Sequence, residues 1–275
     1  MDVISLINMK GGVGKSTTTH NLAGALALAG RRVLLVDNDP QSSLSQGLLG
    51  PAAAEGLEPE STVAAVYAGT ATPGAVVRPS GVAGVDLVAG SIHTDRHNRP
   101  TPEEAPWPDQ VAVRDFLAEV ADSYDVALID NPPNLHLCSW AALAASGWVL
   151  IPVQPEDYGA QGLAAVRRSI ARVRSAVNPD LRLLGYLITM AQPRRAIHQL
   201  YEEQLRSDYG DDVLATRVPA AADFPEAVAH RKPVTHHKPR SAAAKSVKAL
   251  AEEVLARTAA AAGGEGRGQG QGEAA

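Results

Sequence analysis

Short apolar runs alternate along the chain with longer segments whose apolar residues recur at helical spacing. We expect strands at residues 3–8, 32–37, 85–88, 126–130, 149–153, 183–189 and 213–218. We expect helices at residues 15–29, 111–122, 161–177, 197–209 and 241–259. Several strands are apolar at nearly every position, as happens when both faces of a sheet are covered. The pattern predicts a single-domain α/β fold with a mostly parallel, twisted sheet between helices.

Two segments fall outside this alternation. Residues 100–108 include four prolines, and we expect an exposed loop there because proline is excluded from helix interiors and central strands. Residues 259–275 have no bulky apolar side chain and end in a glycine-rich polar run, which predicts a disordered tail. The folded domain is therefore expected to span residues 1–258.

Composition narrows the functional classes. With 25 basic and 30 acidic residues, the 275-residue chain has a formal charge of −5, so any binding to nucleic acid requires a local basic patch. The single cysteine, Cys138, excludes an intramolecular disulfide framework, and we expect it to be a small buried residue. The first residues do not form a secretory signal, and the longest apolar run, residues 140–153, is shorter than the ~20 residues of a membrane span. We expect a soluble, cytoplasmic protein that does not bind membranes.

The sequence KGGVGKST, residues 10–17, lies between the first predicted strand and the first predicted helix. Its glycines, Gly11, Gly12 and Gly14, allow backbone N–H groups to surround phosphate oxygens at a helix N-terminus. In a P-loop the lysine at this place, Lys15, reaches the β and γ phosphates, and the following hydroxyl, Ser16, binds Mg²⁺. The strict P-loop pattern has glycine at position 9 and does not require Lys10, so this loop is a variant.

Two acidic motifs follow predicted strands. The sequence DNDPQ, residues 37–41, places Asp37 and Asp39 at a carboxyl strand end, and the run VALID ends in Asp130. Carboxyl ends of parallel strands meet at one edge of the sheet, so these carboxylates face the same crevice as the loop. Asp130 is the expected outer-shell partner of Mg²⁺, which prefers oxygen ligands and keeps several of its waters.

The loop with Lys10 resembles that of the deviant Walker A ATPases, which include the ParA and Soj partition proteins, MinD and the nitrogenase iron protein. The resemblance covers residues 2–255 and is most specific in the loop and at residues 37–41 and 154–163. It implies an ATP-sandwich homodimer in which Lys15 serves its own nucleotide and Lys10 reaches the partner's phosphates. It also implies that residues 151–163 form part of the dimer interface.

The resemblance further implies roles for individual residues. Asp39 would position the attacking water, with Asp37 in support, and Ser16, Asp39 and Asp130 would serve the Mg²⁺ ion. Residues 218–227 would surround the adenine, with Pro219 as the best single candidate. The implied ATP contacts are Lys10, Gly11, Gly12, Val13, Gly14, Lys15, Ser16, Thr17 and Pro219.

The number of cysteines and the composition of the last helix indicate which branch of the family the chain resembles. One cysteine per chain does not suit an iron–sulfur protein, and the alanine-rich last helix does not resemble the membrane-binding helix of MinD. The chain resembles the short, Soj-like partition proteins, which bind nonspecific DNA as ATP-bound dimers. The expected DNA contacts are Arg194, Arg195, Arg231, Lys232, Lys238, Arg240, Lys245 and Lys248. Where Soj-like proteins often carry Arg-Asn-Val, this chain has Ala220, Ala221 and Ala222, so one expected contact is missing.

The leading hypothesis is a Mg²⁺-dependent ATPase that moves plasmids or chromosomes over the nucleoid with a ParB-like partner. A second hypothesis keeps the ATPase but assigns it a protein assembly as cargo. A third is a metabolic P-loop kinase or ligase, which would work without DNA or dimerisation.

Overall fold

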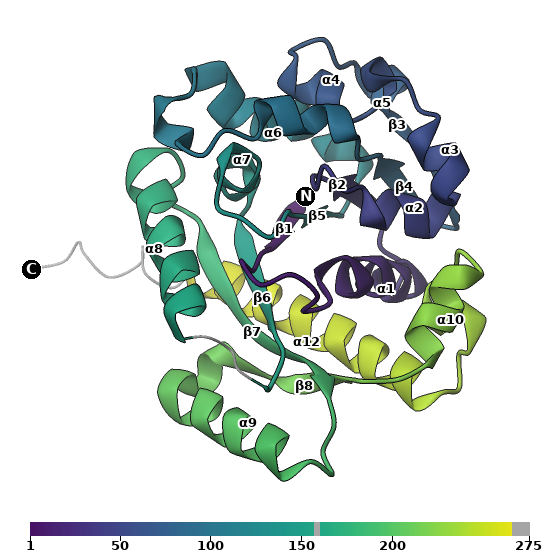
Figure 1. The fold of residues 1–275 in the computed structure, drawn as a ribbon, viewed down its shortest axis with the longest axis vertical. Coiled ribbons are helices and arrows are strands. Elements are labelled where there is room, and N and C mark those ends of the chain that lie inside the picture. The colour runs from purple at the N-terminus through teal and green to yellow at the C-terminus, as the bar shows by residue number, and fades with distance from the viewer. Residues whose placement is uncertain (157–159, 266–275) are drawn as a thin grey trace, which may run out of the picture.

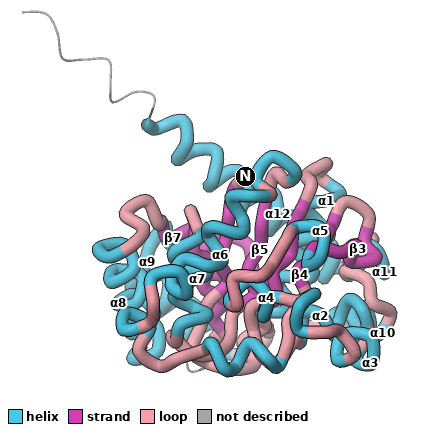
Figure 2. Tube along the Cα trace, turned by 90° about the horizontal axis from the view of Figure 1, so that it is seen from above, coloured by secondary structure: helices cyan, strands magenta, loops and turns pink. Residues whose placement is uncertain are grey.

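The computed structural model describes residues 1–156 and 160–265, and it shows one sheet between two layers of helices (Figures 1 and 2). The strands are β1 (Asp2–Leu6), β2 (Val33–Asp37), β3 (Val77–Val82), β4 (Val85–Val88), β5 (Val126–Asp130), β6 (Trp148–Val153), β7 (Arg182–Ala191) and β8 (Val213–Pro219). Their order in the sheet is β3-β4-β2-β5-β1-β6-β7-β8, and only β3 runs antiparallel to its neighbour. The predicted fold class is confirmed.

Helices of very different length connect these strands. The α-helices are α1 (Lys15–Leu28), α2 (Ser43–Leu49), α3 (Pro51–Glu55), α4 (Val63–Tyr67), α5 (Pro73–Val76), α6 (Trp107–Glu119), α7 (Leu137–Ala145), α8 (Ala160–Ala176), α9 (Ala196–Tyr209), α10 (Asp223–Ala229), α11 (Val234–His237) and α12 (Ala242–Glu265). Short 3₁₀ helices are η1 (Pro59–Ser61), η2 (Ile92–His97), η3 (Pro102–Glu104), η4 (Ala121–Ser123) and η5 (Gly210–Asp212).

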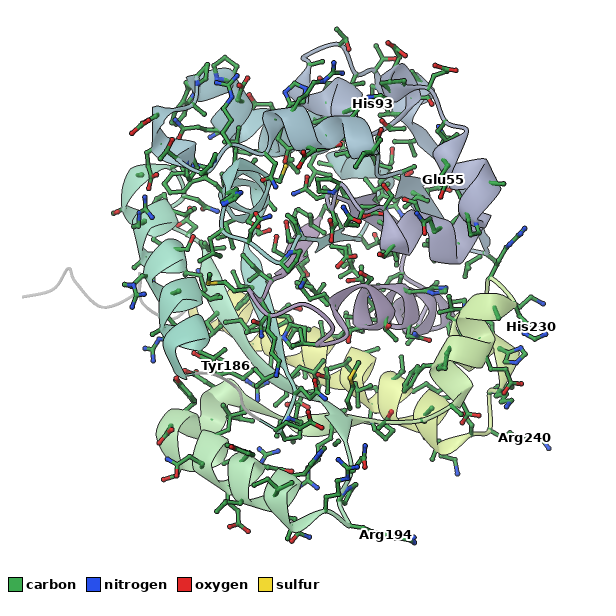
Figure 3. The ribbon with its side chains drawn as sticks, viewed as in Figure 1. Glu55, His93, Tyr186, Arg194, His230 and Arg240 are labelled. Carbon is green, nitrogen blue, oxygen red and sulfur yellow. The ribbon has the colours of Figure 1, made fainter. Side chains whose placement is uncertain are left out.

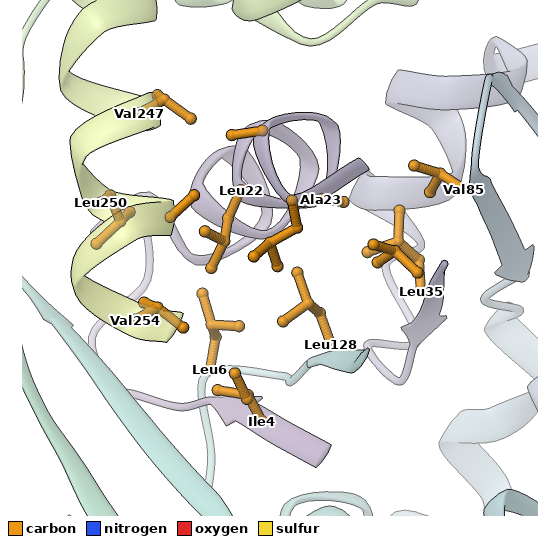
Figure 4. Close-up of a cluster of buried hydrophobic side chains, with 14 of the residues drawn as sticks. Ile4, Leu6, Leu22, Ala23, Leu35, Val85, Leu128, Val247, Leu250 and Val254 are labelled. Atoms are coloured by element: carbon orange, nitrogen blue, oxygen red, sulfur yellow. The ribbon is translucent and has the colours of Figure 1, made fainter. Parts of the chain in front are cut away.

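Both faces of the sheet are buried, as the apolar strands predicted. In β2, Val33 and Leu35 face the layer formed by α1, α2 and α12, whereas Leu34 and Val36 belong to the core on the other face. Figure 4 shows the first of these cores, where α1 and α12 pack over β1, β2 and β5. The position of α1 matters for the site because the phosphate loop leads directly into it.

Several elements differ from the sequence prediction. β3 was missed because it contains Pro79 and Gly81, which weaken a strand signal but are tolerated at a sheet edge. α7 was missed because its side chains are almost all apolar and it is buried on every side, so it shows no helical period. The short helices α2 to α5, α10 and α11 were also not predicted.

Two predicted boundaries were wrong. The expected loop at residues 100–108 contains η3 and ends inside α6, where Pro108 occupies the first turn, a place that tolerates proline. α12 continues to Glu265, so residues 259–265 are helical rather than part of a tail, as alanine's high helix propensity allows. Residues 266–275 of the predicted tail lie outside the described residues. Cys138 is fully buried, as predicted.

Candidate nucleotide-binding site

The phosphate loop connects β1 to α1 and depends on its glycines. Gly12 has a φ of 77° and Gly14 a φ of 83°, in the left-handed region that favours glycine. Val13 is buried below the loop, and its carbonyl accepts a hydrogen bond of 2.8 Å from the Thr189 hydroxyl. The loop is therefore anchored from β7 as well as from its own flanking elements.

Lys15 lies across the loop and is only 7% exposed. Its Nζ donates to the carbonyl oxygens of Asn8, at 3.1 Å, and Lys10, at 3.4 Å. Burial lowers the pKa of Lys15, and the carboxylates of Asp130 and Asp39 act in the opposite direction. A cation held in this way is placed to neutralise phosphate charge without a large rearrangement.

Lys10 is placed differently, since its side chain is exposed at the rim of the loop. Its backbone N–H donates to Asn8 Oδ1 at 2.9 Å, and Asn8 Nδ2 donates to the Pro152 carbonyl at 2.7 Å. Asn8 thus fixes the start of the loop to the end of β6. The two lysines differ in burial: Lys15 is directed inward and Lys10 is open to the solvent side.

The register of the sheet brings two predicted carboxylates together. Asp130 on β5 pairs with Leu6 on β1 and with Asp37 on β2, so both acids lie at the strand ends beside the loop. Asp130 is fully buried, and neither of its carboxylate oxygens has a hydrogen-bond partner among the described residues. Burial and the neighbouring Asp37 raise the pKa of Asp130 well above its usual range, while the nearby Ser16 hydroxyl and Lys15 lower it.

These unsatisfied oxygens fit a hydrated Mg²⁺ ion, whose waters would donate to Asp130. Within residues 1–156 and 160–265, no three His, Cys, Asp or Glu side chains converge as a metal site. A magnesium ion at this site would be held by the Ser16 hydroxyl together with phosphate oxygens and water. It would supply positive charge that stabilises the phosphates.

Asp37 and Asp39 have distinct contacts. Asp37 Oδ2 accepts hydrogen bonds from the backbone N–H and hydroxyl of Ser45 on α2, at 2.8 and 2.6 Å. Burial raises the pKa of Asp37 to about 7 despite these bonds. Asp39 is 8% exposed, and its Oδ1 accepts from the Gln41 N–H at 2.9 Å. Asp37 therefore ties the end of β2 to α2, whereas Asp39 is the more accessible of the two carboxylates.

A buried amide network holds the same strand ends in place. Asn38 Nδ2 donates to Asn131 Oδ1 at 3.0 Å and to the Cys138 carbonyl at 2.8 Å, and Tyr67 donates to Asn38 Oδ1 at 2.8 Å. Asn131 Nδ2 donates in turn to the Leu6 carbonyl at 3.1 Å. This network gives a structural reason for asparagine at position 131.

A cavity of about 510 Å³ opens beside the loop. Its lining residues are Gly14, Thr17, Thr18, Thr189, Met190, Val218, Pro219, Ala220, Ala221, Phe224, Pro225 and Val228. Its walls are mainly apolar, and one end reaches the phosphate loop, which suits a planar base joined to phosphates. Pro219, the predicted adenine contact, is one of the lining residues.

Comparisons with known proteins identify the family of this chain. The family described as AAA domain matches residues 1–183. The chromosome-partitioning ATPase Soj of Thermus thermophilus is 38% identical over 258 residues, covering 92% of this chain and 95% of the relative. The sporulation initiation inhibitor protein Soj of Bacillus subtilis is 34% identical over 92% of this chain and 98% of its own length.

The chain belongs to the ParA and Soj family of partition ATPases.

Solved structures share the fold of this ParA/Soj-type ATPase. Cobyrinic acid a,c-diamide synthase from Mycobacterium smegmatis, with bound ADP and magnesium, has a TM-score of 0.78 and 27% identity over 95% of this chain and 96% of that one. McdA from Cyanothece has a TM-score of 0.79 at 17% identity over 93% of this chain and 99% of that one, and shows a common fold alone. No helix within the described part of this ParA/Soj-type chain is long and apolar enough to cross a membrane.

The predicted DNA contacts do not all have the same surroundings in this ParA/Soj-type protein. All of them are exposed except Lys238, which is half-buried; the exposed ones are Arg194, Arg195, Arg231, Lys232, Arg240, Lys245 and Lys248. Lys238 is paired with Asp223, at 3.0 Å, and with Glu226, at 2.5 Å. Arg195 lies 3.8 Å from Glu156. The sequence could not reveal these pairs because the acids come from other segments.

Arg231 also has a contact that the sequence did not predict. A Cβ added to Gly50, which follows α2, would lie 2.5 Å from the guanidinium of Arg231. The arginine is therefore packed directly over that glycine, with its backbone at a φ of 55°. Its contact with α2 makes it partly a structural residue.

The sequence reasoning missed several residues of the site. Asn8 anchors the loop, and Thr18, Thr189, Met190 and Val228 line the base cavity. Asn8 lies two residues before Lys10, and this closeness to the loop is the only local signal for it. The cavity residues come from α1, β7, β8 and α10, which meet only in the folded chain. Of the predicted interface segment at residues 151–163, residues 157–159 lie outside the described residues.

Proposed function

We propose that this ATPase forms a homodimer around two ATP molecules, binds nonspecific double-stranded DNA in that state, and drives plasmid or chromosome partition. The observation that carries the proposal is the contrast between the buried Lys15 and the exposed Lys10 at the two ends of one loop. Lys15 serves the bound nucleotide, and Lys10 is directed toward a second subunit's phosphates. A cation supplied in trans makes hydrolysis depend on dimerisation, as an arginine finger does.

The catalytic residues of the proposed reaction are those beside the phosphates. Lys10 and Lys15 stabilise charge on the transferred phosphoryl group, and Asp39 positions the attacking water. Mg²⁺ is held by Ser16, with Asp130 and Asp39 in contact with its waters. The adenine occupies the cavity beside Pro219. Basal turnover is slow because one subunit alone lacks the partner's lysine.

ATP acts as the switch in the proposed cycle. The ATP-bound dimer holds DNA through Arg194 and the exposed lysines near α11 and α12, and a ParB-like partner releases it by stimulating hydrolysis. The protein then localises to the nucleoid in the cytoplasm. The full-length likeness to Soj proteins named for chromosome partitioning supports this cargo. A neighbouring gene for a protein assembly, in place of a centromere-binding protein, would favour another cargo.

The dimer is tested by measuring mass in solution with ATP and Mg²⁺. Asp39→Ala should accumulate as a dimer because it binds ATP without turning it over. Adding Lys10→Ala should leave a monomer that still binds ATP, whereas adding Lys245→Ala, a matched exposed lysine, should leave the dimer intact. ATP-bound Asp39→Ala that stays monomeric, or a dimer indifferent to Lys10→Ala, would contradict the proposal. Full ATP turnover by a monomeric Lys10→Ala protein would favour a metabolic kinase or ligase.

A further inference from the structure

The helix α8 carries a basic surface that the nucleotide site does not use. Its sequence, AQGLAAVRRSIARVRSA, contains four arginines and no acidic residue. All four are exposed: Arg167, Arg168, Arg172 and Arg174. In a chain with a net charge of −5, this concentration of positive charge on one helix is unusual for a merely solvated face.

The helical repeat explains how the arginines share one face. The buried residues Leu163, Val166, Ile170 and Val173 pack into the core beside β6 and β7. At 3.6 residues per turn, the arginines then lie on the outer half of the helix, in two rows. Arg167 and Arg174 form one row, Arg168 and Arg172 form the other, and small exposed residues, Ala171 and Ser175, lie between the rows.

Two of these arginines contact neighbouring side chains, and the other two have no acidic side chain beside them among the described residues. Arg172 pairs with Glu103 and lies 6.0 Å from the Trp140 ring centre, and Arg167 lies 5.6 Å from the ring centre of Tyr209. Arg168 and Arg174 have no acidic or hydrogen-bonding partner among the residues that the structure describes. They retain their full charge for an external anion.

This surface is separate from the basic residues predicted to bind DNA. In Figure 3, nitrogen-bearing side chains stand out from the outer side of α8, while the labelled Arg194 and Arg240 lie elsewhere, beyond α9 and near the start of α12. α9 lies between α8 and Arg194 and carries the acids Glu202 and Glu203. The two basic areas are therefore not one continuous patch.

The chemistry of the α8 face favours phosphate over protein. Protein interfaces centre on aromatic or large apolar anchors, and the outer face between these arginine rows offers only Ala171 and Ser175. Phosphate contacts need only well-spaced donors, and the arginine guanidinium binds phosphate in a bidentate way. Backbone phosphates carry no sequence information, which agrees with nonspecific binding.

We propose that the outer face of α8 is a second DNA-contact surface, which binds the phosphate backbone of duplex DNA through Arg168 and Arg174, aided by Arg167 and Arg172. This inference rests on the proposed function, because it assumes that the ATP-bound protein binds DNA. The α8 surface adds DNA contacts on a side of the molecule where the sequence predicted none. Near α10 and α11, Lys238 is already paired with Asp223 and Glu226. Contacts from α8 would therefore raise the affinity for DNA above what the basic residues near α10 and α11 provide.

The test compares two double variants of the full chain, with ATP and Mg²⁺, on a short random-sequence DNA duplex over a range of salt. Arg168→Ala/Arg174→Ala removes the two uncompensated charges, and alanine keeps the helix. Arg31→Ala/Arg96→Ala removes two exposed charges away from α8 and is the matched control. The α8 variant should lose roughly tenfold in affinity, and its log–log salt slope should become shallower by about 2, since each lost phosphate contact removes about 0.9.

A lysine variant and the behaviour of the wild type distinguish failure of the α8 proposal from failure of the proposed function. Arg168→Lys/Arg174→Lys should restore most of the affinity, because lysine also binds phosphate as a point charge. If the wild type binds DNA but the α8 variant matches the Arg31→Ala/Arg96→Ala control in affinity and slope, the α8 surface does not contact DNA. If the wild type binds no DNA in any nucleotide state, the proposed function itself fails, and the α8 proposal fails with it.

Discussion

His20 should make the stability of this protein depend on pH in a way that one substitution removes. The residue lies on α1, five positions after Lys15, and is only 3% exposed. Its Nε2 has no hydrogen-bond partner among the described residues. Burial, with a smaller effect of the nearby His236, lowers the pKa of His20 to about 4. The folded protein therefore holds this imidazole neutral at pH values where an unfolded chain would protonate it.

The sign and size of the effect follow from linkage. The pKa rises from about 4 in the folded state to 6.5 in the unfolded state, so His20 stabilises the fold fully above pH 6.5. That contribution is lost as the pH falls from 6.5 toward 4. At 1.36 kcal/mol for each pKa unit, the total loss is about 3 kcal/mol, and about 2 kcal/mol of it is lost by a pH of about 5.

Chemical unfolding of the wild type and His20→Leu at a series of pH values tests this reasoning. Leucine fills a similar volume and cannot be protonated, so the variant should lose about 2 kcal/mol less than the wild type between a pH of about 7.5 and about 5. His93→Leu, at an exposed histidine, is the control and should follow the wild type. A His20→Leu variant as sensitive to acid as the wild type would refute the assignment.

Three further predictions concern the nucleotide site. Lys15→Ala should abolish productive ATP binding in calorimetry, and normal hydrolysis by this variant would remove the phosphate-loop assignment. Asp39→Ala should bind ATP but hydrolyse it about 10²-fold more slowly or worse, whereas Asp37→Asn should stay within about tenfold of the wild type because the amide oxygen can still accept from Ser45. Equal losses in the two variants would count against their separate roles. Ala221→Trp should fill the base cavity and raise the Kd for ATP at least about tenfold, with unchanged thermal stability of the nucleotide-free protein; unaltered binding would place the base elsewhere.

Much of the fold was predictable because its signals are local. The fully apolar strands, β2 and β5 among them, require cover on both faces, and that requirement alone indicates a helix–sheet–helix arrangement. β3 and α7 escaped prediction for opposite reasons. The strand β3 carries proline and glycine that only an edge position tolerates, and α7 has no polar face to reveal its period.

The site shows the same division between local and long-range information. Gly12, Gly14 and Lys15 all lie in one short loop, so their spacing in the sequence identifies them. Partners supplied by distant segments cannot be read in this way. The pairing of Lys238 with Asp223 and the bond from Thr189 to the loop exist only because the chain folds.

The most direct test of the account is binding of the wild-type protein to a random-sequence DNA duplex with ATP, with ADP and without nucleotide, at two salt concentrations. The account predicts binding that requires ATP and weakens steeply as salt rises, because the contacts are to phosphates. Equal binding in all three states would contradict the nucleotide switch. Absence of binding in every state would contradict the DNA-based mechanism while leaving the ATPase assignment in place.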